Sequence, residues 1–126
     1  MSVTGKPRIL VVDDDLFIRK PLESILQQGG FEAMTAANGT ECLERLEQER
    51  PDLILLDVIM PGPDGFEVCR AIKGEARYAE IPVILMSARA RQSDQQRGID
   101  LGATGFVRKP YLPEALLRQV REVLSN

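Results

Sequence analysis

Five polar residues stand where apolar segments of the sequence end: Asp13, Asp14, Asp57, Ser87 and Lys109. Two carboxylates about 4 Å apart repel by roughly 4 kcal/mol at an effective dielectric constant near 20, so acids gathered at one place need a cation. Carboxylate oxygens without histidine or thiolate favour a hard ion, and Mg²⁺ suits a few carboxylates that leave room for phosphate oxygens. With a hydroxyl and an ammonium group nearby, such a site could transfer a phosphoryl group to a carboxylate.

These residues come together only if the chain folds as alternating strands and helices. Five short apolar runs, separated by longer segments of helical pattern, are the predicted strands: 8–13, 32–36, 52–57, 82–87 and 105–109. Three are nearly continuous in Val, Ile and Leu, as in parallel strands covered on both faces. The order predicts an α/β fold with one doubly wound, five-stranded parallel sheet and helices on both faces. Its functional crevice lies at the carboxyl ends of the strands, where the polar residues stand.

Local signals place the helices between the strands. Gly29–Gly30 predicts the end of the first helix, and Leu43 and Leu46 mark the buried side of the second. Ser93 begins the sequence SDQQ, which has the form of a capping box and predicts the start of the fourth helix.

Composition limits the class of protein. The 126 residues, 44% hydrophobic, are enough for one domain without disulfides, and Cys42 and Cys69 match no metal spacing, so we expect both to be buried thiols. The net charge of −3 argues against direct binding to nucleic acid or an anionic membrane. There is no spanning segment or apolar signal core, so we expect a cytoplasmic protein. The lack of histidine excludes His-based catalysis and His-ligated zinc.

Each polar residue also has an ordinary structural interpretation. Asp14 or Asp15 could cap the following helix, Ser87 could be a turn residue, and Lys109 could be solvated before a proline. With these interpretations, it would be a coincidence that four strands end in polar residues at one edge of the sheet. We therefore favour the interpretation that these residues form one site.

The residues in this pattern resemble the receiver domain of bacterial two-component response regulators, over about residues 7–125. The resemblance rests on ILVVDDD, LILLDVIMPGPDG, IPVILMSA and FVRKP, each at the end of a predicted strand. It implies a flavodoxin-like fold with strand order 2-1-3-4-5. We expect residues 1–126 to be one receiver domain, with no output domain following it.

The same resemblance assigns roles to the site residues. Asp57 would be the phosphoacceptor, Asp13 and Asp14 the acidic pair that holds Mg²⁺, and Asp57 and the main-chain carbonyl of Ile59 further ligands. Lys109 would contact the phosphoryl group.

The resemblance further implies a cis peptide bond between Lys109 and Pro110 and a switch made by Ser87 and Phe106. After phosphorylation, the Ser87 hydroxyl would turn toward the phosphoryl group and Phe106 would rotate inward, altering the surface of the fourth helix, fifth strand and fifth helix. Only Ile99 and Leu101 are large apolar anchors near the fourth helix, so we expect that helix to be among the least stable elements.

The resemblance implies a signalling switch and not an enzyme, apart from its own phosphoryl transfer and slow autodephosphorylation. Because the chain has no histidine, its phosphodonor would be a sensor histidine kinase or a histidine phosphotransfer protein. The downstream protein is not specified by the sequence, and a phosphorylation-dependent dimer is possible. Ile59 and Arg89 flank the path of the hydrolytic water, so we hypothesise slow dephosphorylation.

Three other interpretations remain open. A haloacid-dehalogenase-type phosphatase would use Asp13 and Asp15 as its Asp-x-Asp motif, but Phe17 stands where that family has Thr or Val, and Asp57 has no role there. A flavodoxin-like electron carrier would not place three aspartates where a phosphate must bind. A receiver-like module that binds partners without being phosphorylated would not need the full set of site residues.

Overall fold

The computed structural model describes residues 5–125 and contains one five-stranded sheet. The strands are β1 (Arg8–Val12), β2 (Glu32–Ala36), β3 (Leu53–Asp57), β4 (Val83–Ser87) and β5 (Gly105–Arg108). All neighbouring strands are parallel, in the order β2-β1-β3-β4-β5. The predicted sheet and strand order are confirmed, and each predicted strand differs from the observed one by at most one residue at an end.

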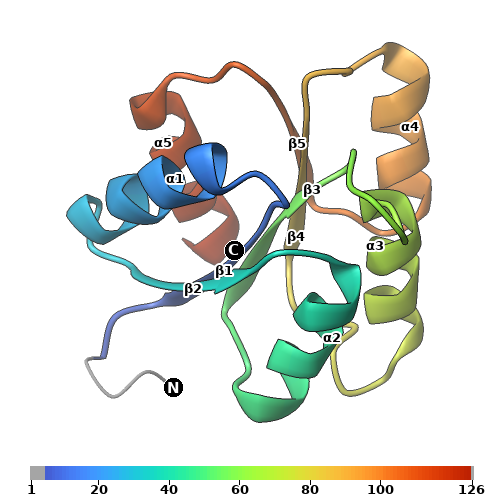
Figure 1. The fold of residues 1–126 in the computed structure, drawn as a ribbon, viewed down its shortest axis with the longest axis horizontal. Coiled ribbons are helices and arrows are strands. Elements are labelled where there is room, and N and C mark those ends of the chain that lie inside the picture. Colours follow the sequence, from blue (N-terminus) through green and yellow to red (C-terminus); the bar gives the residue numbers. More distant parts are fainter. Residues whose placement is uncertain (1–4, 126) are drawn as a thin grey trace.

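Five helices cover both faces of this sheet (Figure 1). They are α1 (Leu16–Gln28), α2 (Gly39–Gln48), α3 (Gly65–Gly74), α4 (Gln92–Asp100) and α5 (Pro113–Ser125). Helices α1 and α5 pack on one face, and α2, α3 and α4 lie on the other. The parallel connections of a doubly wound sheet place its helices in this way.

Strand β3 shows why the apolar runs are continuous. Leu53 and Leu55 belong to the core beneath α1 and α5, whereas Ile54 and Leu56 belong to the core beneath α2 and α3. All four side chains are fully buried. Because successive side chains of a strand point to opposite faces, a strand covered on both sides needs apolar residues at every position. The first polar residue of β3 is Asp57, at its carboxyl end.

The helix ends agree with the sequence except at α4. Asp15 caps α1 by accepting a hydrogen bond from the Phe17 amide (2.9 Å), and the helix ends at Gly29. The capping box predicted from Ser93 is wrong, because α4 begins at Gln92 and Ser93 already lies in its first turn. The carboxylate of Asp94 instead accepts a hydrogen bond from the Arg91 amide (3.2 Å).

Two apolar residues predicted to anchor helices are solvent-exposed. Leu43 is 36% exposed, since α2 turns the neighbouring Cys42 and Leu46 into the core. Ile99 is 64% exposed and does not anchor α4. The residue of α4 that meets the sheet is Gly98, where an added Cβ would lie 2.9 Å from Cδ1 of Leu85.

The remaining predictions from composition can be compared directly with the structure. Cys42 and Cys69 are buried free thiols, as predicted. Burial raises the pKa of Cys42 to about 12 and also raises the pKa of Cys69, which suits a structural role for both. Within residues 5–125, no helix is long and apolar enough to cross a membrane.

Candidate functional site

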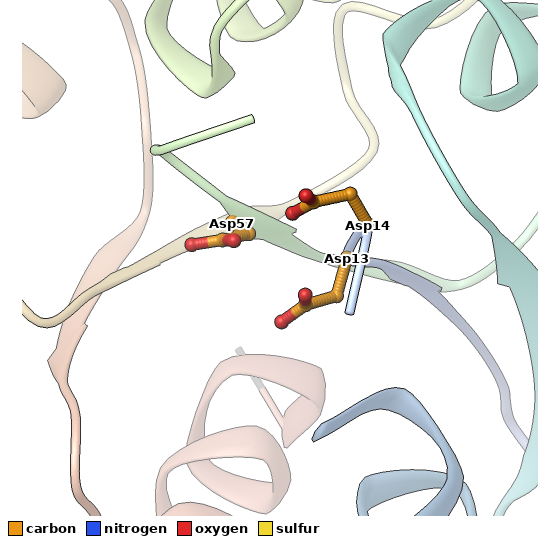
Figure 2. A group of neighbouring side chains, drawn as sticks. All are labelled: Asp13, Asp14 and Asp57. Carbon is orange, nitrogen blue, oxygen red and sulfur yellow. The ribbon is translucent and has the colours of Figure 1, made fainter. Parts of the chain in front are cut away.

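The acidic residues of the site converge because β1 and β3 are adjacent and end at the same level. Val12 of β1 pairs with Leu56 of β3, so Asp13 and Asp57 are the next residues along these two neighbouring segments. Figure 2 shows their carboxylates and that of Asp14 grouped beyond the two strand ends. One oxygen from each of the three carboxylates lies within 4.8 Å of the others. Asp13 and Asp57 are buried, whereas Asp14 is exposed to solvent.

Lys109 reaches this group from the end of β5. Its amide donates a hydrogen bond to the carbonyl of Ser87 (2.9 Å), which fixes the backbone beside β4. Its Nζ atom donates to Oδ2 of Asp13 (2.8 Å) and lies 3.3 Å from Oδ1 of Asp57. The peptide bond between Lys109 and Pro110 is cis. The lysine therefore lies between two of the three acids.

The surroundings of Asp57 favour its protonated, neutral form more than water does. Burial and the Asp13 charge together raise the pKa of Asp57 to about 6, although the nearby Lys109 charge acts in the opposite direction. A hydrogen bond from the backbone of Ile59 also favours the ionised form. Burial alone would lower the pKa of Lys109, but its contacts with Asp13 and Asp57 raise it above its ordinary value.

Lys109 supplies the fixed positive charge expected at this site and compensates part of the charge of the acids. Three carboxylates against one ammonium group still leave the site electronegative when the acids are ionised. The group can therefore hold a cation in addition to the lysine.

Ser87 lies at the same edge of the sheet, at the end of β4. Its neighbour Met86 pairs with Asp57, so Ser87 extends one residue beyond that pair. The side chain is fully buried, and its Oγ atom accepts a hydrogen bond from the Arg89 amide (3.0 Å). The hydroxyl is therefore held by its own loop, close to Asp57 in the register of the sheet.

Phe106 lies within the sheet, whereas the side chain of Ile59 is exposed to solvent. Phe106 pairs with Leu85 in the interior of the sheet and is half-buried against the core beneath α2 and α3. With Gly98 and Ile99 it lines a cavity of about 170 Å³ between α4 and β5. The Ile59 side chain, two residues after Asp57, is 55% exposed.

One contact at the site was not predicted from the sequence. Nη1 of Arg19, on α1, donates a hydrogen bond to the main-chain carbonyl of Asp13 (2.7 Å). Arg19 thereby fixes the backbone that carries two of the three carboxylates. A basic residue one turn into a helix has many ordinary explanations, so its type and spacing alone gave no signal.

Comparison with known proteins identifies the family. The model of the response regulator receiver domain family matches residues 9–121. The chain belongs to this family. A receiver domain is a phosphoacceptor signalling module of two-component response regulators, so the interpretation drawn from the strand-end motifs is confirmed.

Relatives and solved structures agree with this assignment. The receiver domain is 41% identical to the probable transcriptional regulator ycf27 of Cyanophora paradoxa over 122 residues, 97% of this chain and 50% of that protein. It is 43% identical to the transcriptional regulatory protein AfsQ1 of Streptomyces coelicolor over 120 residues, 95% of this chain and 52% of that protein. The chain thus spans about half the length of these relatives. The structure of chemotaxis protein CheY4 of Vibrio cholerae has a TM-score of 0.90 and 35% identity, and the match covers 94% of this chain and 99% of that one.

Proposed function

We propose that this receiver domain accepts a phosphoryl group on Asp57 from a phosphohistidine of a sensor kinase or histidine phosphotransfer protein. The observation that carries the proposal is the position of Asp57, a buried carboxylate with Asp13, Asp14 and Lys109 around it. A buried carboxylate is costly to a fold even when a lysine is paired with it, so a chemical role explains Asp57 at the end of β3 better than a structural one.

The acidic group fits Mg²⁺. The three carboxylate oxygens within 4.8 Å of one another are hard donors, which suit Mg²⁺ better than a softer metal. Asp13, Asp14 and Asp57 would hold the ion, with the main-chain carbonyl of Ile59 as a further ligand. Bound Mg²⁺ would neutralise charge on the phosphoryl oxygens.

The side chains of the domain supply the remaining chemistry. A carboxylate oxygen of Asp57 attacks phosphorus, the P–N bond to the donor imidazole breaks, and the imidazole keeps the electron pair. Lys109, held between Asp13 and Asp57, can rotate its ammonium group onto a phosphoryl oxygen. Asp57, Lys109 and the Ser87 hydroxyl would thus be the catalytic residues for the domain's own phosphorylation.

The signal would leave the site through Ser87 and Phe106. When the Ser87 hydroxyl turns to a phosphoryl oxygen, it gives up the hydrogen bond from the Arg89 amide. Phe106 then moves inward, and the surface of α4, β5 and α5 changes for a partner. Weak anchoring of α4 supports this proposal, because its buried residues are only Asp94 and Gly98.

The net charge of the domain and the names of its relatives bear on which downstream partner it binds. The acidic composition favours a downstream protein over direct contact with DNA or a membrane, although ycf27 and AfsQ1 are named as transcriptional regulators. We propose a cytoplasmic switch of one receiver domain, residues 1–126 with a core at 7–125. Its downstream protein could also be a second phosphorylated copy, as a dimer.

Incubation with acetyl phosphate and Mg²⁺, followed by intact mass, tests the proposal. The wild-type domain should gain one phosphoryl group, and Asp57→Asn should gain none. Asp52→Asn is the matched control, because Asp52 lies just before the opposite end of the same strand. Failure of the wild type to be labelled would favour an interaction module that is not phosphorylated. Equal labelling of Asp57→Asn would assign the phosphate to another residue.

A further inference from the structure

One buried acid lies outside the proposed phosphorylation site. Among residues 5–125, the buried polar or charged side chains are Asp13, Asp57, Ser87 and Asp94. The first three belong to the site already described. Asp94 lies in the first turn of α4, and its side chain is only 9% exposed. A buried carboxylate destabilises a protein unless cations or hydrogen-bond donors compensate it, so its partners identify what it does.

Two arginines of the loop between β4 and α4 surround the Asp94 carboxylate. Oδ2 accepts hydrogen bonds from the amide and from Nε of Arg91, both at 3.2 Å. Oδ1 lies 3.5 Å from Nη2 of Arg89. Burial alone would raise the pKa of Asp94, but the hydrogen bonds from Arg91 and the Arg89 charge lower it, which keeps the carboxylate ionised.

Arg89 connects this carboxylate to the phosphorylation site. Its amide donates to Oγ of Ser87, so its backbone lies at the edge of the sheet where Asp57 stands. Its side chain is half exposed, so the ion pair with Asp94 is the main contact that a turn of the guanidinium group would break. Guanidinium binds phosphate oxygens through paired, charge-assisted hydrogen bonds, more strongly than an exposed ion pair with one carboxylate oxygen.

We propose that Asp94 is a positioning residue for Arg89: it holds the guanidinium group at the start of α4, and a phosphoryl group on Asp57 competes for the same cation. This inference rests on the proposed phosphorylation of Asp57. Coupling between two sites is reciprocal, so Asp94 weakens phosphoryl binding by the same factor by which the phosphoryl group loosens the contact between Asp94 and Arg89. Phosphorylation therefore removes one of the contacts that hold the first turn of α4.

Binding of beryllofluoride, an analogue of the phosphoryl group, tests the inference when it is titrated by calorimetry in the presence of Mg²⁺. Asp94→Asn keeps an oxygen acceptor for the Arg91 amide but removes the charge that holds Arg89. Because the Arg89 side chain is half exposed and its ion pair with Asp94 is therefore weak, this variant should bind the analogue about two- to fivefold more tightly. Asp100→Asn, which removes a charge from the far end of α4, should bind as the wild type does.

A double-mutant cycle separates positioning from a structural role. In an Arg89→Gln background, Asp94→Asn should no longer change the affinity for beryllofluoride. The inference would be overturned if Asp94→Asn raised the affinity for beryllofluoride equally with and without Arg89, or did not raise it at all. If Asp94→Asn does not fold, Arg89→Gln alone decides, because it should bind more weakly than the wild type and equal affinity would contradict the proposal.

The proposed function can fail independently in the same experiment. Binding to the wild type and its loss in Asp57→Asn test phosphorylation at Asp57 without reference to Asp94. If the wild type binds and Asp94→Asn has no effect, only the role of Asp94 is wrong. If the wild type does not bind, both proposals fail together.

Discussion

The Nζ atom of Lys109 lies 3.3 Å from Oδ1 of Asp57, although β3 and β5 are not neighbours in the sheet. The side chain reaches across the end of β4, which lies between them. The lysine thus supplies a fixed positive charge to a carboxylate that burial would otherwise favour in its protonated form. The phosphoryl transfer that we propose at Asp57 would use this long-range contact.

Replacing Lys109 by methionine should slow phosphorylation of Asp57. Loss of the ammonium group removes the charge that lowers the pKa of Asp57, so a smaller fraction of the carboxylate is ionised. It also removes a group that can stabilise the phosphoryl oxygens, and we expect a rate about tenfold to hundredfold lower with acetyl phosphate. A time course of intact mass measures it. Lys20→Met, at an exposed lysine of α1, should leave the rate unchanged, and an unchanged rate in Lys109→Met would contradict the role of this residue.

Asp57 should make the metal-free domain less stable at neutral pH than in acid. The pKa of Asp57 is raised to about 6 in the folded protein, compared with 3.8 as its ordinary value. Below the ordinary value both states are protonated and there is no penalty, and the penalty is complete once the pH exceeds the folded pKa. A shift of this size corresponds to about 3 kcal/mol, which solvent screening reduces to about 1–2 kcal/mol.

Asp57→Asn should therefore be more stable than the wild type at about pH 7.5 and lose this advantage near pH 4. Chemical denaturation in EDTA measures both differences, and adding Mg²⁺ should reduce the advantage at the higher pH. A difference in stability that is independent of pH would show that the Asp57 charge is not its cause.

The exposed Ile59 should slow the loss of the phosphoryl group. Its apolar side chain stands two residues after Asp57 and is 55% exposed, and our hypothesis is that it shields the phosphoryl group from a hydrolytic water. Ile59→Asn opens this position to water and adds a polar group that can orient it, so the phosphoprotein should decay about threefold to tenfold faster. Leu112→Asn, at another exposed apolar residue, is the control. An unchanged or longer half-life in Ile59→Asn would refute the hypothesis.

Gly98→Ala should destabilise the domain, whereas Gly74→Ala should not. An added Cβ at Gly98 would lie 2.9 Å from Cδ1 of the buried Leu85, so either this side chain or α4 must shift. The expected loss in the free energy of unfolding is about 1–3 kcal/mol. Gly74 has open space around it, and alanine there should stabilise α3 by up to about 1 kcal/mol. Urea denaturation of both variants checks the pair, and equal effects would show that the contact with Leu85 does not matter.

The sheet and the positions of its polar residues could be predicted from the sequence because each depends on local rules. A strand buried on both faces leaves a continuous apolar run, as Leu53 to Leu56 do, and topology then brings the strand ends together. The convergence of Asp13, Asp57 and Lys109 follows from that rule without knowledge of any side-chain geometry.

Contacts made by helix residues could not be predicted in this way. Helical spacing leaves the buried face uncertain by one residue, so Leu43 was expected to be buried although the neighbouring Cys42 and Leu46 face the core. The bond from Arg19 to the Asp13 carbonyl and the contact between Arg89 and Asp94 depend on how each helix is seated on the sheet. Charged residues at exposed helix ends are common, and their sequence pattern does not distinguish a surface residue from a partner of the site.

Gly98, in the last turn of α4, affects how easily this helix can move. Helix α3 inserts Phe66, Cys69 and Ile72 between the side chains of the sheet, so sliding it would break interlocked packing. Helix α4 meets β4 through Gly98, which has no side chain to interlock. A translation of α4 across the sheet thus disrupts less packing than the same movement of α3, so α4 is the more easily displaced of the two.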